Sequence, residues 1–471
     1  MPATALTAAS DSFWESAVDL DSASPAPSAE PLSGPLDVDV AVIGGGYTGL
    51  WTAYYLKKAQ PSLNVVVLER RSCGFGASGR NGGWLYSGFA GRSVFAERYG
   101  IQRAIAMQRA MNAAVDEVLN VCAAEGIDAH QTKGGVLEVA CTPAQVERLD
   151  AFVAAEHAFG QTHVERLDAA RAAERIAIPG VLGASWDPGG ARIQPALLVR
   201  GLAAAARRVG VDIYEHTAVT RILPAKDGGL ARAVTDRGTV SAPYVLRCTE
   251  GFTADLPRER RSWLPMNSSL IVTAPLPASF WQSAGWEGRE VLGDFAHAYM
   301  YAQRTADDRI ALGGRGVPYR FGSRTDVVGA TPRRTVEQLT TILHRMFPGT
   351  RGVAVEQAWS GVLGVPRDWC STVALDHDSG LGWAGGYVGS GVAAANLAAR
   401  TLRDLTLGPK TELTELPWVG HRVRRWEPEP LRWIGVHGLY AAYHLSDVLE
   451  GRGCRRTPVL ARIADAVTGR Y

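Results

Sequence analysis

The residues with the clearest chemical role are six near the start of the chain, Gly44-Gly45-Gly46-Tyr47-Thr48-Gly49. They match the pattern G-x-G-x-x-G, follow the β-branched run of residues 38–43 and open a helical pattern. Such glycines permit a tight turn, let backbone approach a pyrophosphate at a helix N-terminus, and allow close helix–strand packing. Glu69 lies 20 residues beyond Gly49, where a carboxylate accepts hydrogen bonds from an adenosine ribose. The spacing predicts a dinucleotide without a 2′-phosphate, with a purely structural turn as the alternative.

A second glycine-rich segment follows within a few residues of Glu69. Its sequence is Cys73-Gly74-Phe75-Gly76-Ala77-Ser78-Gly79-Arg80-Asn81-Gly82-Gly83-Trp84. So much glycine predicts a second stretch of backbone lying against a bulky ligand, which a nicotinamide dehydrogenase would not need. A flexible surface loop is the alternative, but the aromatic residues Phe75 and Trp84 within the segment favour the ligand.

The elements around these segments alternate between strand and helix. Residues 38–43, 47–59 and 65–68 predict one β-α-β unit. Residues 219–223 and 231–235 predict a hairpin around Asp227-Gly228-Gly229. Further strands are expected at 135–140, 211–216, 244–248 and 381–384, and further helices at 92–126, 143–159, 195–209, 332–346 and 392–407. Residues 268–316 are strand-rich and predict a separate mixed sheet, and the last 55 or so residues predict helices.

Composition excludes several classes of protein. The 471 residues are 46% hydrophobic and 20% charged, which is typical of a folded enzyme of two to three structural units. The net charge of +2 gives no argument for nucleic acid or an acidic membrane as a partner. Six scattered cysteines without C-x-x-C spacing predict reduced, mostly buried thiols and no metal site. The N-terminus lacks a basic region, and the uncharged stretches 41–56 and 379–399 suit cofactor loops better than lipid, so we expect a soluble, cytoplasmic protein.

The chain resembles the D-amino-acid oxidase-like family of FAD-dependent oxidoreductases, and within it the gamma-glutamylputrescine oxidase-like subgroup. The run Gly-Phe-Gly-Ala-Ser-Gly-Arg-Asn-Gly-Gly at 74–83 carries the resemblance, together with an N-terminal arm anchored by Trp14. The resemblance implies an α/β fold in which a Rossmann-like FAD-binding domain, discontinuous in sequence, joins a mixed-sheet substrate domain and a helical C-terminal tail. The expected division is an extended arm at 1–36, the FAD-binding domain at 37–92, 190–258 and 355–410, the substrate domain at 93–189 and 259–354, and the tail at 411–471.

The resemblance also implies which residues hold FAD. The first glycine segment would contact the pyrophosphate, Glu69 the ribose, and Val219 the adenine through its backbone. Glu250 departs from the family's usual Ala-Thr-Gly, and the loop at 387–392 would lie near the flavin N1/O2 locus and stabilise the anionic reduced flavin. The expected cofactor-binding residues are Gly44, Gly46, Tyr47, Thr48, Glu69, Arg70, Arg71, Gly76, Ala77, Ser78, Asn81, Gly82, Gly83, Trp84, Val219, Thr249, Glu250, Gly251, Gly361, Tyr387, Val388, Gly389, Gly391 and Val392.

The chemistry implied is oxidation of a C–N bond in a small amine or amino acid. Hydride would pass to flavin N5, the imine would hydrolyse, and O2 or another acceptor would reoxidise the flavin, so no outstanding general base is required. His297, Tyr299 and Tyr301 alternate in GDFAHAYMYAQ and are expected to share one face of a strand, either at the site or as an ordinary amphipathic strand. Arg315 would clamp a carboxylate unless it is a surface residue, and Trp84 would narrow the pocket unless it belongs to the core.

Several alternatives stay open. Some members of the family attach FAD through a cysteine near the position of Cys370, but the surrounding residues are only loosely similar and a buried free thiol is the interpretation preferred. A flavin monooxygenase fed by NAD(P)H is a second candidate function. A protein with structural FAD that docks through the Arg/Trp-rich segment 421–433 is a third, although a brace between domains explains that segment more simply. Polyamine derivatives, N-methyl amino acids and D-amino acids all remain candidate substrates, and the oligomeric state is open.

Overall fold

A six-stranded sheet forms around the predicted β-α-β unit. The computed structural model describes residues 12–21, 30–314, 318–325 and 329–468. In it β2 (Val40–Ile43), α2 (Tyr47–Ala59) and β3 (Val65–Leu68) confirm the unit. The strand order is β19-β20-β13-β2-β3-β9, with β9 (Asp212–Tyr214), β13 (Tyr244–Arg247), β19 (Thr372–Asp376) and β20 (Leu381–Gly385). Only β19, at one edge, is antiparallel to its neighbour, so segments far apart in sequence build one parallel sheet.

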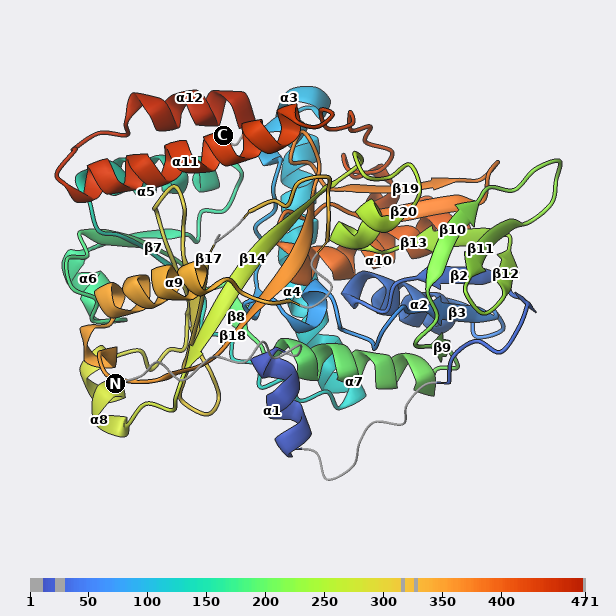
Figure 1. Ribbon diagram of the computed structural model, residues 1–471, viewed down its shortest axis with the longest axis horizontal. Coiled ribbons are helices and arrows are strands. Elements are labelled where there is room, and N and C mark those ends of the chain that lie inside the picture. Colours follow the sequence, from blue (N-terminus) through green and yellow to red (C-terminus); the bar gives the residue numbers. More distant parts are fainter. Residues whose placement is uncertain (1–11, 22–29, 315–317, 326–328, 469–471) are drawn as a thin grey trace.

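Helices cover one face of this sheet and a smaller sheet covers the other (Figure 1). The helices are α2, α4 (Ile101–Glu125), α7 (Pro195–Arg208) and α10 (Gly391–Leu407), which share one hydrophobic core. On the other face lies a four-stranded sheet of order β1-β12-β11-β10, formed by β1 (Leu36–Asp37), β12 (Thr239–Ala242), β11 (Ala231–Thr235) and β10 (Val219–Leu223). The antiparallel pairing of β10 with β11 confirms the predicted hairpin.

An eight-stranded mixed sheet forms the second half of the molecule, as the strand-rich middle of the chain predicts. Its order is β18-β14-β17-β16-β15-β5-β7-β6, with β5 (Val136–Ala140), β6 (Glu165–Asp168), β7 (Gly183–Asp187), β14 (Leu264–Thr273), β15 (Val291–Asp294), β16 (Tyr301–Arg304), β17 (Ile310–Gly314) and β18 (Val355–Val365). The core on one face includes side chains of α6 (Ala169–Ala173), α8 (Ala278–Ala284) and α9 (Arg333–Met346), while α5 (Pro143–Ala158) packs near β5 and β7. β18 lies in this sheet, although its residues fall in the range expected for the FAD-binding domain.

Two expected elements differ in the structure. The helix expected over 92–126 is split into α3 (Arg92–Tyr99) and α4 by Gly100, whose φ of 90° an α-helix does not accommodate. The strand expected to carry His297, Tyr299 and Tyr301 on one face is wrong: residues 295–300 form the turn between β15 and β16. The short pair β4 (Trp84–Leu85) and β8 (Ala191–Arg192) forms a separate two-stranded sheet.

The two ends of the chain pack against this frame. The arm expected to be extended contains the helix α1 (Phe13–Asp21), and Trp14 anchors it by donating its Nε1–H to the Asn81 carbonyl at 2.8 Å. The described part of the chain also contains four short 3₁₀ segments, at Ala77–Gly79, Glu250–Asp255, Pro348–Thr350 and Glu412–Glu415. The expected helical tail is confirmed by α11 (Leu431–Gly451) and α12 (Val459–Thr468), which lie along one edge of the molecule (Figure 1). Within the described residues, no helix combines the length and apolar character needed to cross a membrane.

Candidate active site

The glycines of the first segment are required by close approaches between backbones. A Cβ on Gly44, whose φ is 105°, would lie 2.6 Å from the Cys248 carbonyl oxygen, and one on Gly49 would lie 2.0 Å from the Gly44 oxygen. A Cβ on Gly46 would lie 2.9 Å from Ser78 Oγ, which accepts a hydrogen bond from the Tyr47 amide at 2.8 Å. The second glycine segment therefore docks directly on the N-terminus of α2.

A cavity of about 130 Å³ lies at this junction. Glu69 is on its wall, where one carboxylate oxygen accepts from the Gly45 amide at 2.7 Å and the other from the Arg71 amide at 2.8 Å. Burial raises the pKa of the Glu69 carboxyl above its usual range. Thirteen of the residues expected to bind the cofactor line this cavity: Gly44, Gly46, Tyr47, Thr48, Glu69, Arg70, Arg71, Gly76, Ala77, Ser78, Val219, Thr249 and Glu250.

Glu250, the departure from the family pattern, connects three segments of this region. Its Oε2 accepts a hydrogen bond from the Gly364 amide at 2.6 Å, and its Oε1 accepts one from the Tyr387 amide at 2.9 Å. Burial raises the pKa of the Glu250 carboxyl to about 7, against the lowering effect of these amides. The side chain thus holds the ends of β18 and β20 at the base of the cavity.

A much larger cavity, of about 1280 Å³, adjoins the first, and both include Ala77 and Val362 in their walls. Seven more of the expected cofactor residues line it: Asn81, Gly82, Trp84, Gly361, Val388, Gly389 and Val392. The remaining four, Gly83, Gly251, Tyr387 and Gly391, pack directly behind the walls. The two adjoining cavities run from Glu69 to the start of α10, and an elongated dinucleotide such as FAD fits this arrangement of glycine backbone and helix N-termini.

Aromatic side chains form one wall of the larger cavity. Tyr301 lies against Gly82, where a Cβ would be 2.7 Å from the ring, and its hydroxyl lies 2.8 Å from Ser268 Oγ. Trp84 donates its Nε1–H to the Ala302 carbonyl at 3.2 Å, and its ring meets Tyr86 edge-to-face at 5.7 Å. Tyr299 also lines the cavity. Three of the five candidate catalytic residues are therefore brought together.

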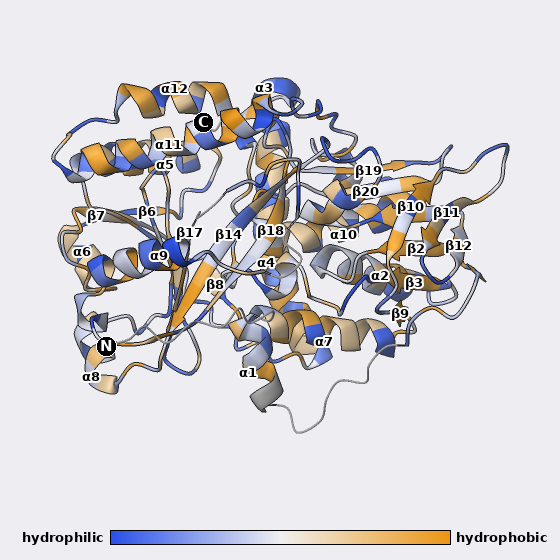
Figure 2. Ribbon diagram, in the orientation of Figure 1, coloured by the Kyte–Doolittle hydropathy of each residue, from blue (hydrophilic) through white to orange (hydrophobic). Residues whose placement is uncertain are grey.

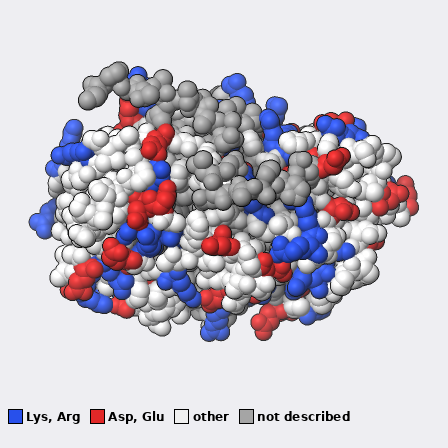
Figure 3. Space-filling view, turned by 90° about the horizontal axis from the view of Figure 1, so that it is seen from below, with Lys and Arg blue, Asp and Glu red and all other residues white. Residues whose placement is uncertain are grey.

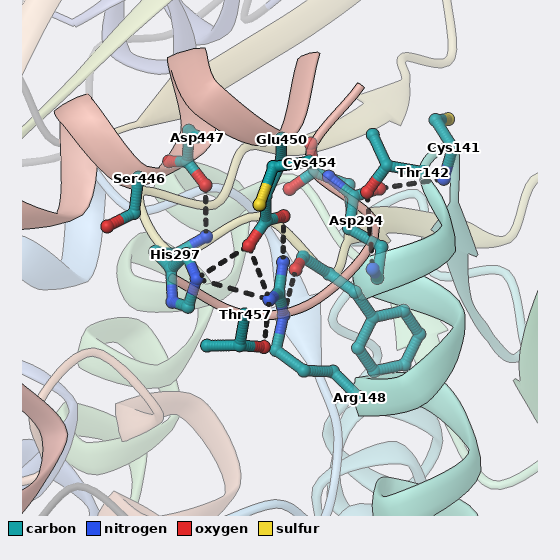
Figure 4. A network of polar contacts seen from close by, with 12 residues as sticks. Cys141, Thr142, Arg148, Asp294, His297, Ser446, Asp447, Glu450, Cys454 and Thr457 are labelled. Carbon is teal, nitrogen blue, oxygen red and sulfur yellow. Dashed lines mark hydrogen bonds and ion pairs between the residues drawn. The ribbon is translucent and has the colours of Figure 1, made fainter. Parts of the chain in front are cut away.

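The other two candidates lie elsewhere. His297 is not part of the cavity wall, and its Nε2 lies 3.0 Å from Glu450 Oε1 (Figure 4). Its ring stacks on Tyr443 of α11. Arg148 joins the same network through two hydrogen bonds to Glu450, at 2.9 and 2.7 Å (Figure 4). His297 therefore lies in the contact between the body and the C-terminal helices. Arg315 lies outside the described residues.

Glu138 is a cavity residue that the sequence reasoning missed. It projects from β5 beside Trp84: a Cβ on Gly293 would lie 3.1 Å from the indole and 3.2 Å from Glu138 Cγ. Within the described part of the chain its carboxylate has no hydrogen-bond or ion-pair partner. Burial, reinforced by nearby acids of which Glu156 is the strongest, raises the pKa of Glu138 to about 8. The feature of the sequence that could have indicated this residue is a single charge within the otherwise apolar run Gly135–Ala140.

Cys370 is a buried thiol, as expected. Its Sγ lies 3.4 Å from the Asp368 carbonyl and does not line either cavity, and burial raises the pKa of the thiol. Asp368, Cys370 and His421 bring three potential metal-ligand atoms within 4.8 Å. Both nitrogens of His421 are already engaged, one with the Asp368 carboxylate and one with the Tyr99 hydroxyl, each at 2.8 Å.

Comparison with known proteins agrees with this geometry. The family model described as FAD dependent oxidoreductase (DAO) matches residues 39–405. Gamma-glutamylputrescine oxidoreductase of Escherichia coli K12 is 30% identical over 406 residues, which cover 84% of this chain and 91% of that protein. Glycine oxidase of Bacillus licheniformis is 24% identical, with 80% of this chain and 95% of that protein covered.

Solved structures share the fold. The crystal structure of glycine oxidase from Geobacillus kaustophilus superposes with a TM-score of 0.68 at 22% identity, covering 82% of this chain and 99% of that one. L-proline dehydrogenase from P. horikoshii gives a TM-score of 0.66 at 19% identity, covering 80% and 96%. The two glycine-rich segments at 44–49 and 74–83, which we call the glycine cradle, lie along two adjoining cavities. Because the family model also matches most of the chain, we conclude that this chain belongs to the DAO family of FAD-dependent oxidoreductases.

Proposed function

We propose that this protein oxidises a C–N bond in a small amine, with FAD as the cofactor. The observation that carries the proposal is that the glycine cradle adjoins a cavity of about 1280 Å³. The wall of this cavity combines aromatic rings with the carboxylate of Glu138, which has no partner among the described residues. When bound, FAD supplies the acceptor for the hydride that leaves the carbon bearing the nitrogen. The relatives named for gamma-glutamylputrescine and glycine also act on compounds that carry an amine.

The residues of this chain would orient the amine and control its charge. Trp84 and Tyr86 offer aromatic surfaces that attract a cation, and ionised Glu138 lies beside that surface. Tyr301, held between Gly82 and Gly313, would fix the distance between substrate and the cofactor edge. The N-terminus of α10, at Gly391, would stabilise negative charge that develops on the cofactor.

The described walls favour an amine over an α-amino acid. Arg92 makes a two-point ion pair with Glu156, at 2.7 and 2.6 Å, and Arg148 makes one with Glu450. Arg80 donates to the Phe75 carbonyl at 2.8 Å. These three guanidinium groups already have acceptors, and the two other described arginines of the wall, Arg456 and Arg462, lie at its exposed C-terminal edge. Glu138, by contrast, offers an acceptor for a cation beside the aromatic wall. We therefore propose amines with a cationic or polar tail, such as polyamine derivatives, as the substrate class.

An anaerobic visible spectrum tests the proposal. The purified holoenzyme is titrated with mono-, di- and N-acylated diamines, with α-amino acids as the comparison set. Bleaching of the flavin band by one class of amine supports the proposal, and recovery in air identifies O2 as an acceptor, whereas bleaching without recovery indicates another acceptor. A flavin that no amine reduces but that NAD(P)H bleaches would overturn the proposal in favour of a monooxygenase.

A further inference from the structure

The C-terminal helices carry an exposed apolar surface. Of the fourteen large hydrophobic residues that are exposed in the described chain, four are scattered over the rest of the molecule and ten lie on α11 and α12. These ten form what we call the C-terminal face: Leu431, Trp433, Ile434, Leu445, Val448, Leu449, Val459, Leu460, Ile463 and Val467. Figure 2 shows the hydrophobic residues along both helices. Clusters of this kind on a folded protein mark interaction sites.

Helix α12 buries small side chains and exposes large apolar ones, which is the reverse of an ordinary surface helix. Ala461 and Ala464 are buried against α11, while Val459, Ile463 and Val467, spaced four residues apart, are 69%, 56% and 55% exposed. A helix that borders water normally buries its largest apolar side chains and exposes its small or polar ones. The large side chains of α12 therefore face away from the body of the protein and are available to a binding partner.

The charges of the C-terminal face have one sign. The three acids between residues 431 and 468 are all engaged on the inner side: Asp447 with the His297 amide, Glu450 with Arg148, and Asp465 with the Tyr443 hydroxyl. The exposed charges of the same stretch are Arg452, Arg455, Arg456 and Arg462. On the face seen in Figure 3, by contrast, acidic and basic residues are interspersed.

The body holds this face in a fixed orientation. The His297 and Ala298 amides donate to Asp447 at 2.8 and 2.9 Å, and Glu450 joins α11 to Arg148 of α5 (Figure 4). At the other end of α11, Arg432 donates to the Tyr319 hydroxyl at 2.8 Å. These contacts hold α11 against the body, so its exposed apolar side chains do not belong to a loose end of the chain.

The large cavity reaches the C-terminal face. Arg456 and Arg462, both exposed, line the cavity together with Thr457 and Asp465. The arginines are thus shared between the cavity wall and the edge of the face. Whatever covers the face therefore lies beside this part of the cavity wall.

We propose that the C-terminal face docks on the surface of an anionic lipid membrane. The apolar side chains would enter the boundary between headgroups and acyl chains, and the arginines would contact lipid phosphates. A second copy of the chain fits less well, because an isologous interface would pair this face with itself and its three acids are already engaged, which leaves the arginines without an anionic partner. The net charge of +2 gave no reason to expect a membrane partner; the one-sided distribution of the charges does. This proposal is independent of the substrate.

Vesicle sedimentation with the full-length holoenzyme tests the proposal. The vesicles are phosphatidylcholine alone or an equal mixture of phosphatidylcholine and phosphatidylglycerol. We expect binding to the mixed vesicles only. Arg452→Gln with Arg455→Gln should weaken it roughly 25-fold, from about fivefold per arginine. Ile463→Ser with Val467→Ser should weaken it by roughly tenfold or more. Leu182→Ser with Leu230→Ser, on exposed leucines elsewhere, is the matched control and should bind normally.

Light scattering coupled to gel filtration is run on the same proteins, and flavin content reports folding. A monomer that binds anionic vesicles through these four residues supports the proposal. Failure of the wild-type holoenzyme to bind the mixed vesicles would overturn it. A dimer that Ile463→Ser with Val467→Ser dissociates would overturn it too, because the face would then be covered by a second copy.

Discussion

Replacing Glu138 by glutamine should abolish a specific pH dependence of cation binding. With a pKa of about 8, the Glu138 carboxyl is protonated in about nine of ten molecules at pH 7. A cation binds the ionised form, so binding at pH 7 should be about tenfold weaker than its limit at high pH, a difference of about 1.4 kcal/mol. The sign follows from the raised pKa: binding tightens as the pH rises and levels off above about 8.

The assay uses a quaternary ammonium ligand such as butyltrimethylammonium, which carries no titratable proton and has no neutral amine to oxidise. Its Kd is followed by perturbation of the flavin absorbance between pH 7 and pH 9, so that the plateau is reached. Asp294, with a pKa of about 6, is already ionised over this range, and Glu250, with a pKa of about 7, lines the other cavity. Glu138→Gln should give a Kd that does not change over this range. Glu147→Gln, which removes an exposed carboxylate from the same cavity wall, is the matched control and should keep the wild-type slope. The reasoning is refuted if the wild-type Kd is independent of pH or if Glu138→Gln keeps the slope.

Four other substitutions test the site and the fold. Glu250→Ala should raise the Kd for FAD at least tenfold in a fluorescence titration at pH 8, where a carboxyl with a pKa of about 7 is mostly ionised. The reason is that two buried amides each lose a charged acceptor worth about 1.5–3 kcal/mol; unchanged affinity would contradict this role. Gly82→Ala should lower the rate of flavin bleaching by about tenfold or more, because its Cβ would lie 2.7 Å from the adjacent tyrosine ring, whereas Gly438→Ala, with open space around its Cβ, should match wild type. Glu450→Ala should lower the free energy of unfolding by about 3–5 kcal/mol, because it strands a buried guanidinium. Since the folded pKa of Glu450 is below the reference value of 4.5, this stabilisation is complete above about pH 4.5 and is lost as the pH falls through the folded pKa, which urea melts at several pH values will show. After acid precipitation, wild type and Cys370→Ala should release the same fraction of FAD into the supernatant, and flavin retained by wild type alone would indicate a covalent bond.

Local sequence signals were enough for the elements that hold the cofactor. The β-α-β unit at 40–68 and the hairpin of β10 and β11 agree with expectation because glycine spacing, β-branched runs and turn residues act over a few neighbours. The six residues after Asp294 show where this reasoning fails. Their alternation of aromatic and small residues resembles a strand, but they form a turn whose histidine packs under α11.

The residues of the site likewise divide into those that local sequence predicts and those whose role depends on the tertiary structure. Glycines and Glu69 could be assigned from spacing because their role depends on backbone shape near one helix end. The state of Glu138 could not, because its raised pKa depends on burial beside Trp84 and on acids from other elements. The sequence showed Glu250 only as a departure from the family's usual Ala-Thr-Gly. Its two backbone partners come from segments more than 100 residues away.

The sequence by itself determined the cofactor, the family and the order of most elements, because each of these depends on short motifs whose geometry is set by neighbouring residues. The tertiary structure decided which charged side chains stand alone in the cavity and which are paired with distant residues. It also decided that the large apolar residues of α12 face outward while its alanines face α11. Both outcomes depend on which surfaces meet across the fold, and that information is distributed over residues far apart in the chain.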